Sequence, residues 1–163
     1  MSDKLQYDKG VYIAGRLSAN ANHSTANAVN YLHNVHRMMK IAQEVKEAGF
    51  SIFVPAIDLL MGIKFGYETY DDYFNNNLVW VKKSDAVFLV PNWYGSPGTE
   101  REIEFAWANN IPVFDQLDEM WEYFQGIEGG KIVDFVRGDN EEPIDVIKYR
   151  KAEPEKYYKS LKK

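Results

Sequence analysis

The chain alternates short, continuous apolar runs with longer stretches in which apolar residues recur at helical spacing. Four runs predict β-strands: residues 11–14, 51–54, 86–90 and 111–114. The helical stretches predict four helices: residues 27–48, 70–83, 100–109 and 118–124. Residues 16–26 read as a polar loop, and residues 56–69 suit either a short helix or a flap.

This order of elements defines the expected fold. Residues 86–90, Ala-Val-Phe-Leu-Val, are apolar without alternation, which is typical of a strand covered on both faces in a parallel sheet. Strands that alternate with helices through short connections predict right-handed crossovers. We therefore expect the α/β class: a doubly wound, mostly parallel sheet of about five strands, Rossmann- or flavodoxin-like.

Apolar spacing also predicts which helix faces are buried. On the helix at 27–48, the expected inner residues are Val29, Leu32, Val35, Met39, Ala42 and Val45. Gly49 is placed to cap that helix. On the helix at 70–83, the expected inner residues are Tyr73, Phe74, Leu78 and Val81.

Size and charge narrow the class of protein. A chain of 163 residues suits one domain, and we place it at residues 1–137, followed by a charged C-terminal arm or tail at 138–163. A net charge of −5 argues against a nucleic-acid partner. The absence of cysteine excludes disulfides and thiolate catalysis. Residues 1–10 lack the apolar core of a signal peptide and no apolar run spans a membrane, so we expect a cytoplasmic protein without a membrane partner.

The most informative segment follows the third predicted strand. Its loop contains Trp93, Ser96 and Gly98, and it leads through Thr99 into a helix that carries Glu102. Free backbone N–H groups at such a helix start accept phosphate or another anion. The alternative is structural, because Thr-x-x-Glu is also a helix capping box.

These residues fit a known pattern. Ser96-x-Gly98-Thr99-x-x-Glu102 resembles the nucleoside 2-deoxyribosyltransferase superfamily, which includes deoxynucleoside 5′-monophosphate N-glycosidases and phage-associated uncharacterised proteins. Residues 11–15, 77–85 and 109–113 match further landmarks in the same order, so the resemblance covers about residues 11–115. Gly98-Thr99-x-x-Glu102 also looks like the lysine-decarboxylase-like phosphoribohydrolases, and both families break N-glycosidic bonds.

The resemblance implies an activity and two catalytic residues. It implies cleavage or transfer at the N-glycosidic bond of a (deoxy)nucleoside 5′-monophosphate or nucleoside. Glu102 would act as nucleophile or stabiliser at C1′, where positive charge develops. Tyr12 would orient that carboxylate, although a tyrosine on a first strand is otherwise a routine half-buried residue. The alternative is a non-catalytic protein that binds or sequesters a nucleotide on the same fold.

The proton donor is where the chain departs from the family. The family has an aspartate at the position of Asn77, and an amide does not donate a proton as an acid does. Asp71 or Asp72, one or two turns earlier, would replace it, unless these two carboxylates only cap their helix. Alternatively, the base would leave with little help. Asn77 would otherwise be a ligand for the base or an ordinary surface residue.

Residues in the loops after the first and third predicted strands are expected to contact substrate. Gly15, Gly98 and Thr99 would line the pocket, and Ser96 suits a 5′-phosphate because a carboxylate there would repel one. Arg16 would add positive charge, or would be a solvated loop residue. Trp93 and Tyr94 would stack on the base, or would serve an interface.

Other features add little chemistry. His33 and His36 lie one turn apart but lack a third ligand, and His23 lies in the loop after the first strand, so no metal and no cofactor is expected. Members of the family are usually homodimers or larger, with a neighbouring subunit completing each pocket. We therefore expect a homo-oligomer that acts on a small nucleotide or nucleoside.

Overall fold

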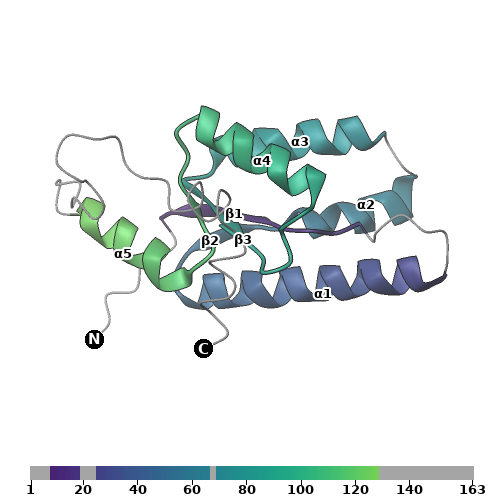
Figure 1. Ribbon diagram of the computed structural model, residues 1–163, viewed down its shortest axis with the longest axis horizontal. Coiled ribbons are helices and arrows are strands. Elements are labelled where there is room, and N and C mark those ends of the chain that lie inside the picture. Colours follow the sequence, from purple (N-terminus) through teal and green to yellow (C-terminus); the bar gives the residue numbers. More distant parts are fainter. Residues whose placement is uncertain (1–7, 19–24, 67–68, 129–163) are drawn as a thin grey trace. The chain divides into compact units, whose positions relative to one another are not determined.

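A computed structural model describes residues 8–18, 25–66 and 69–128 (Figure 1). Its sheet has four parallel strands in the order β2-β1-β3-β4, which confirms the expected α/β class with a Rossmann/flavodoxin-like sheet. The strands are β1 (Gly10–Ala14), β2 (Ser51–Phe53), β3 (Ala86–Leu89) and β4 (Val113–Phe114). We expected about five strands, and the described residues form four.

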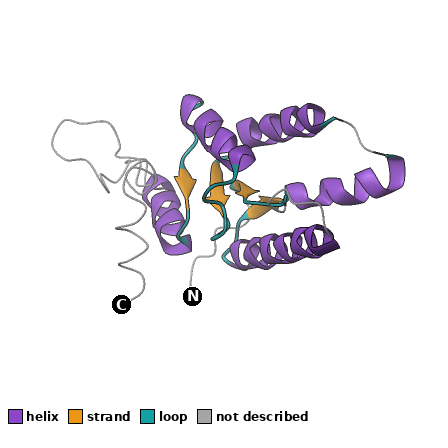
Figure 2. Cartoon of the chain, turned by 45° about the vertical axis from the view of Figure 1, so that its right-hand side comes forward, coloured by secondary structure: helices purple, strands orange, loops and turns teal. Residues whose placement is uncertain are grey.

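Helices cover both faces of the sheet. They are α1 (Thr25–Glu47), the 3-10 turn η1 (Pro55–Ile57), α2 (Asp58–Phe65), α3 (Tyr70–Lys83) and α4 (Pro97–Ala108). Helix α1 lies on one side of the strands, and α3 and α4 lie together on the other (Figures 1 and 2). This division follows from the strand order, because the chain moves one way from β1 to β2 and the other way from β2 to β3 and β4.

The core forms where the sequence predicts it. All four residues of β3 are buried, and so are the last four of β1, as expected for central strands between two helical layers. Phe74 and Val81 of α3 are buried as predicted, and Gly49 ends α1 with φ of 101°. Segment 56–69, for which the sequence suited either a short helix or a flap, contains the end of η1 and the whole of α2.

The predicted inner face of α1 is wrong in its first half. Val29, Leu32 and Met39 are more than half exposed, whereas Met38, Ala42 and Val45 are buried. The helix therefore turns Met38, rather than Met39, toward the sheet. Apolar residues occupy two faces of this half of α1, so spacing alone does not select between them.

The chain divides into two compact units, Met1–Val113 and Phe114–Lys163. The second contains α5 (Leu117–Glu128), which is longer than the helix expected at 118–124. Within it, the Tyr123 ring contacts the Phe114 and Phe124 rings. The expected charged arm at 138–163, and its boundary, lie outside the described residues. No helix in the described part of the chain is both long and apolar enough to cross a bilayer.

Candidate functional site

The strand order locates the point where a ligand is expected. In open α/β sheets, ligands bind beyond the carboxyl ends of the strands, where successive connections leave in opposite directions. In this chain that point lies between β1 and β3, which pair in parallel from Val11–Ala86 to Ala14–Leu89. The loops that follow these two strands begin at Gly15 and at Val90.

The two loops are held very close together. A Cβ on Gly15 would lie 2.7 Å from Cβ of Val90, so only glycine fits there without displacing the backbone. Asn92 then links three segments, because its amide nitrogen donates to the Asn34 side chain of α1 at 3.0 Å and to the carbonyl of Arg16 at 3.4 Å. The backbone beyond both strands is therefore fixed by packing and hydrogen bonds.

Helix α4 begins three residues earlier than expected, and this overturns the capping-box alternative. Ser96 is the N-cap and Pro97 the first helical residue, so Thr99 lies inside the first turn. The Ser96 side chain makes no capping hydrogen bond and instead accepts one from the Thr99 hydroxyl at 3.1 Å. The first backbone N–H groups of α4, at Gly98 and Thr99, therefore have no side-chain cap.

Glu102 pairs with Tyr12 across the sheet. The Tyr12 hydroxyl donates to Oε1 of Glu102 at 2.7 Å, and both side chains are buried. Tyr12 also stacks on Phe53, its neighbour in β2, at 5.7 Å between ring centroids. The Tyr12 ring therefore lies on the α3/α4 side of the sheet, fixed between a strand neighbour and the carboxylate.

Burial sets the protonation of this pair. Loss of hydration raises the pKa of Glu102 from 4.5 to about 7, and the hydrogen bond from Tyr12 opposes that rise. The pKa of Tyr12 lies well above 10.0, first because of burial and then because of the Glu102 charge. Near neutral pH Tyr12 is therefore a fixed donor, while Glu102 exchanges between acid and carboxylate.

Access to Glu102 is restricted in this conformation. Its exposed fraction is 7%, and those of Ser96 and Thr99 are 7% and 2%. A cavity of about 800 Å³ lies beyond the ends of β1 and β3, but Arg16 is the one predicted site residue among those that line it. A sugar ring reaches Glu102 only if the segments that cover it move.

The proton-donor candidates on α3 lie in different environments. Asp72 forms a capping box with Thr69, accepting from its amide at 3.1 Å and its hydroxyl at 2.6 Å. These hydrogen bonds lower the pKa of Asp72, and the side chain is exposed, so the structure gives Asp72 the alternative role of a helix cap. Asp71 is exposed too. Asn77 is half-buried, and its buried Oδ1 has no hydrogen-bond partner among the described residues.

Arg16 and Trp93 both support the loop after β3. Arg16 donates from Nη2 to the carbonyl of Tyr94 at 2.9 Å, so it stabilises this loop. Trp93, expected to stack on a base or serve an interface, is 2% exposed, and its ring meets the Tyr94 ring edge-on at 5.7 Å between centroids. Tyr94 is half exposed and is the aromatic ring of this loop that a ligand can reach.

Sequence analysis missed two residues near this site. The charge of Asp58, at the start of α2, raises the pKa of Tyr12, so a second carboxylate acts on the Tyr12–Glu102 pair. It lies in segment 56–69, whose structure the apolar pattern left open. Asn92 lies three residues after the end of β3 at Leu89, and a polar residue at that edge was the available signal.

The described residues hold no cluster of three side chains from His, Asp and Glu that would bind a metal ion. His33 and His36 are exposed on α1. His23 lies outside the described residues.

The strand order, with the candidate site at the carboxyl ends of β1 and β3, defines a flavodoxin-like, doubly wound α/β protein. Residues 9–115 match the model of the family described as Domain of unknown function (DUF4406), and the chain belongs to that family. No curated protein and no solved structure matches the chain.

Proposed function

We propose that this protein cleaves, or transfers a base at, the N-glycosidic bond of a (deoxy)nucleoside 5′-monophosphate or nucleoside. The observation that carries the proposal is the buried Tyr12–Glu102 hydrogen bond of 2.7 Å at the carboxyl-terminal side of the sheet. In this role the Glu102 carboxylate attacks or shields C1′ as the bond to the base breaks. Tyr12 acts as a positioning residue because it holds the carboxylate by its Oε1.

The start of α4 supports a phosphate on the substrate. Gly98 and Thr99 present backbone N–H groups at a helix start whose N-cap side chain leaves them uncapped. Ser96, immediately before them, adds a neutral hydroxyl. A 5′-phosphate bound here would lie one helical turn from Glu102, which favours a nucleotide over a free nucleoside.

A chromatographic assay for free base tests this proposal. The protein is incubated with the four deoxynucleoside monophosphates and the four deoxynucleosides. We expect base release from at least one monophosphate, at a rate that rises with pH through about 7 as Glu102 ionises. Tyr12→Phe removes the hydrogen bond that lowers the pKa of Glu102, so its profile moves to higher pH. Absence of release from every compound contradicts the proposal.

The departing base also requires a proton. Asn77 cannot supply it and Asp72 caps α3. Asp58, half-buried at the start of α2, is a further carboxylate whose charge reaches Tyr12, and we propose it as the donor in its protonated form. Asp58→Asn should slow release from the natural base far more than from a nucleotide with a good leaving group, whereas Asp72→Asn should leave both rates unchanged. Equal effects of the two variants would contradict this assignment.

A second candidate is a protein that binds a nucleotide without turnover. Two observations favour it: the Asn77 amide in place of an acid, and the 7% exposure of Glu102. Calorimetric binding of a deoxynucleoside monophosphate, with no base released after long incubation, would select this candidate.

We also propose that the protein is a homodimer or a larger homo-oligomer. Large apolar side chains are exposed on two helices: Val29, Leu32 and Met39 on α1, and Leu60, Met61 and Phe65 on α2. Several such residues on one helix are typical of an interaction surface. A neighbouring subunit there would remove them from water.

A further inference from the structure

The cavity beyond β1 and β3 is lined by residues other than Tyr12 and Glu102. It measures about 800 Å³, within the range of small-molecule sites, and one wall is α1 from Asn30 to Glu44. The opposite wall is formed by Arg16, Pro91 and Asn92. We name this cavity the α1 groove. It lies on the α1 side of the sheet, whereas Tyr12 and Glu102 lie on the α3/α4 side.

Positive charge dominates the α1 groove, although the whole chain carries −5. Arg16, Arg37 and Lys40 line it, and Glu44 is the single carboxylate among its lining residues. Arg37 and Lys40 form no ion pair with any described residue. A local excess of cations on an acidic protein indicates an anionic ligand.

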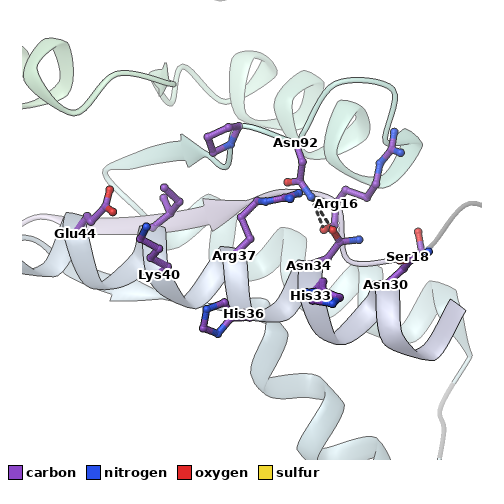
Figure 3. Close-up of a pocket in the computed structure, with 12 residues that line it drawn as sticks. Arg16, Ser18, Asn30, His33, Asn34, His36, Arg37, Lys40, Glu44 and Asn92 are labelled. Carbon is purple, nitrogen blue, oxygen red and sulfur yellow. Dashed lines mark hydrogen bonds between the residues drawn. The ribbon is translucent and has the colours of Figure 1, made fainter. Parts of the chain in front are cut away.

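The spacing of the cations indicates which anion. Arg37 and Lys40 are three residues apart on α1, so their Cβ atoms lie about 5–6 Å apart on one face. Arg37 extends from α1 toward Asn92 (Figure 3). The charged ends of Arg37 and Lys40 lie at different places along the groove (Figure 3), so each can hold one of two linked phosphate groups, and a guanidinium binds phosphate oxygens in pairs.

The polar residues beside Arg37 are already ordered. Asn34 and Asn92 are joined by the 3.0 Å hydrogen bond between their side chains (Figure 3). A wall fixed before the ligand arrives lowers the entropy lost on binding. No Phe, Tyr or Trp side chain lines the groove in the described part of the chain, so nothing there stacks on a base.

From these contacts we propose that the α1 groove is a second ligand site, which binds a small molecule through a pyrophosphate group. Arg37 and Lys40 bind the two phosphates, and Asn34 and Asn92 shape the wall beside them. The ligand is recognised through its phosphates rather than through a nucleobase. This site is independent of the proposed N-glycosidic activity, because none of its ligands is Glu102, Tyr12 or an α4 amide.

Calorimetry on the full chain at low salt tests this site, with inorganic pyrophosphate and ADP as probes. We expect both probes to bind within about threefold of each other. The double variant Arg37→Gln/Lys40→Gln should weaken both at least tenfold, because it removes the two cations that bind the phosphates. The matched control Lys46→Gln/Lys82→Gln removes the same charge outside the groove, and it should bind within about twofold of wild type.

Three results would overturn the proposal. The first is no binding of pyrophosphate by the wild-type protein at millimolar concentration. The second is an equal loss of affinity in the control variant, which would mean that overall charge alone attracts the probe. The third is an affinity for pyrophosphate that rises severalfold in Glu102→Gln, which would place the anion near α4 instead. Unchanged pyrophosphate binding in Glu102→Gln supports the α1 groove even if no base is ever released.

Discussion

Glu102 is the residue on which the account depends, and its burial has a consequence for stability. Its pKa is raised by burial from 4.5 to about 7, so the folded protein binds this proton more tightly than the unfolded chain does. The stability that this proton contributes is complete below pH 4.5 and is lost as the pH rises through about 7. The loss is on the order of 3 kcal/mol, at 1.36 kcal/mol per pKa unit.

Glu102→Gln removes this titration while keeping an acceptor for Tyr12. Between pH 4 and pH 9, we expect the wild type to lose about 3 kcal/mol of unfolding free energy relative to the variant. Urea unfolding at several pH values measures it. A difference that stays constant with pH would contradict a raised pKa for Glu102.

At the residue scale, sequence reasoning reached the important pair only through the family resemblance. The apolar pattern predicts a strand at residues 11–14 and a helix at residues 100–109. It does not predict that Tyr12 and Glu102 are in contact. The chain did carry a signal for the true start of α4, since Ser96-Pro97 is a common N-cap and first-turn pair. The burial of Trp93 was not foreseen, because its position in a loop does not reveal that its side chain is packed inside the protein.

At the scale of elements, the close approach of β1 and β3 is the feature that shapes the site. In Gly15→Ala the new Cβ would lie 2.7 Å from Cβ of Val90. Because both atoms are attached directly to the backbone, the contact is relieved only if the backbone shifts. We expect a loss of about 1–3 kcal/mol in unfolding free energy, as for other overpacked sites. Urea unfolding checks it.

Gly10→Ala is the matched control, because the new Cβ meets nothing closer than 3.8 Å, at Asp85 Oδ2. It should be as stable as wild type. If the two alanine variants are equally stable, the loops beyond β1 and β3 are not as tightly apposed as described.

The elements differ in how well apolar pattern predicts them. Helix α3 has the bounds that its spacing predicts, because its buried and exposed faces are distinct and Thr69-x-x-Asp72 caps its start. Helix α1 has apolar residues on two faces, so its inner face depends on contacts with β1 and β2 that one-dimensional spacing does not contain. Segment 56–69 gave no clear period, yet α2 within it supplies Asp58.

At the scale of the whole molecule, the exposed apolar residues of α1 and α2 support self-association. Sedimentation equilibrium should give the mass of a dimer or a larger assembly at micromolar concentration. Leu60→Glu/Phe65→Glu places two charges among these side chains and should reduce the mass toward one chain of 18.9 kDa.

Circular dichroism of the same variant should match wild type, because both side chains are more than half exposed. A wild-type protein that sediments as a single chain would contradict the proposed homo-oligomer.

The sequence was sufficient for the fold class, but the strand order β2-β1-β3-β4 comes from the structure, because it depends on which strands pair. Four apolar runs that form strands, joined by right-handed helical crossovers, are compatible with few arrangements of a parallel sheet. The α1 groove was not foreseen, because its cations lie on separate elements, with Arg16 after β1 and Arg37 and Lys40 on α1.

Base release by two glutamate variants of α4 tests the central claim most directly. Glu102→Gln and Glu104→Gln remove one carboxylate each from the same helix, but Glu104 is exposed. At pH 8, with the deoxynucleoside monophosphate that wild type cleaves, we expect Glu102→Gln to be slower by at least about a hundredfold and Glu104→Gln to stay within about twofold. A Glu102→Gln variant as active as wild type would contradict the assignment of this carboxylate to the N-glycosidic bond.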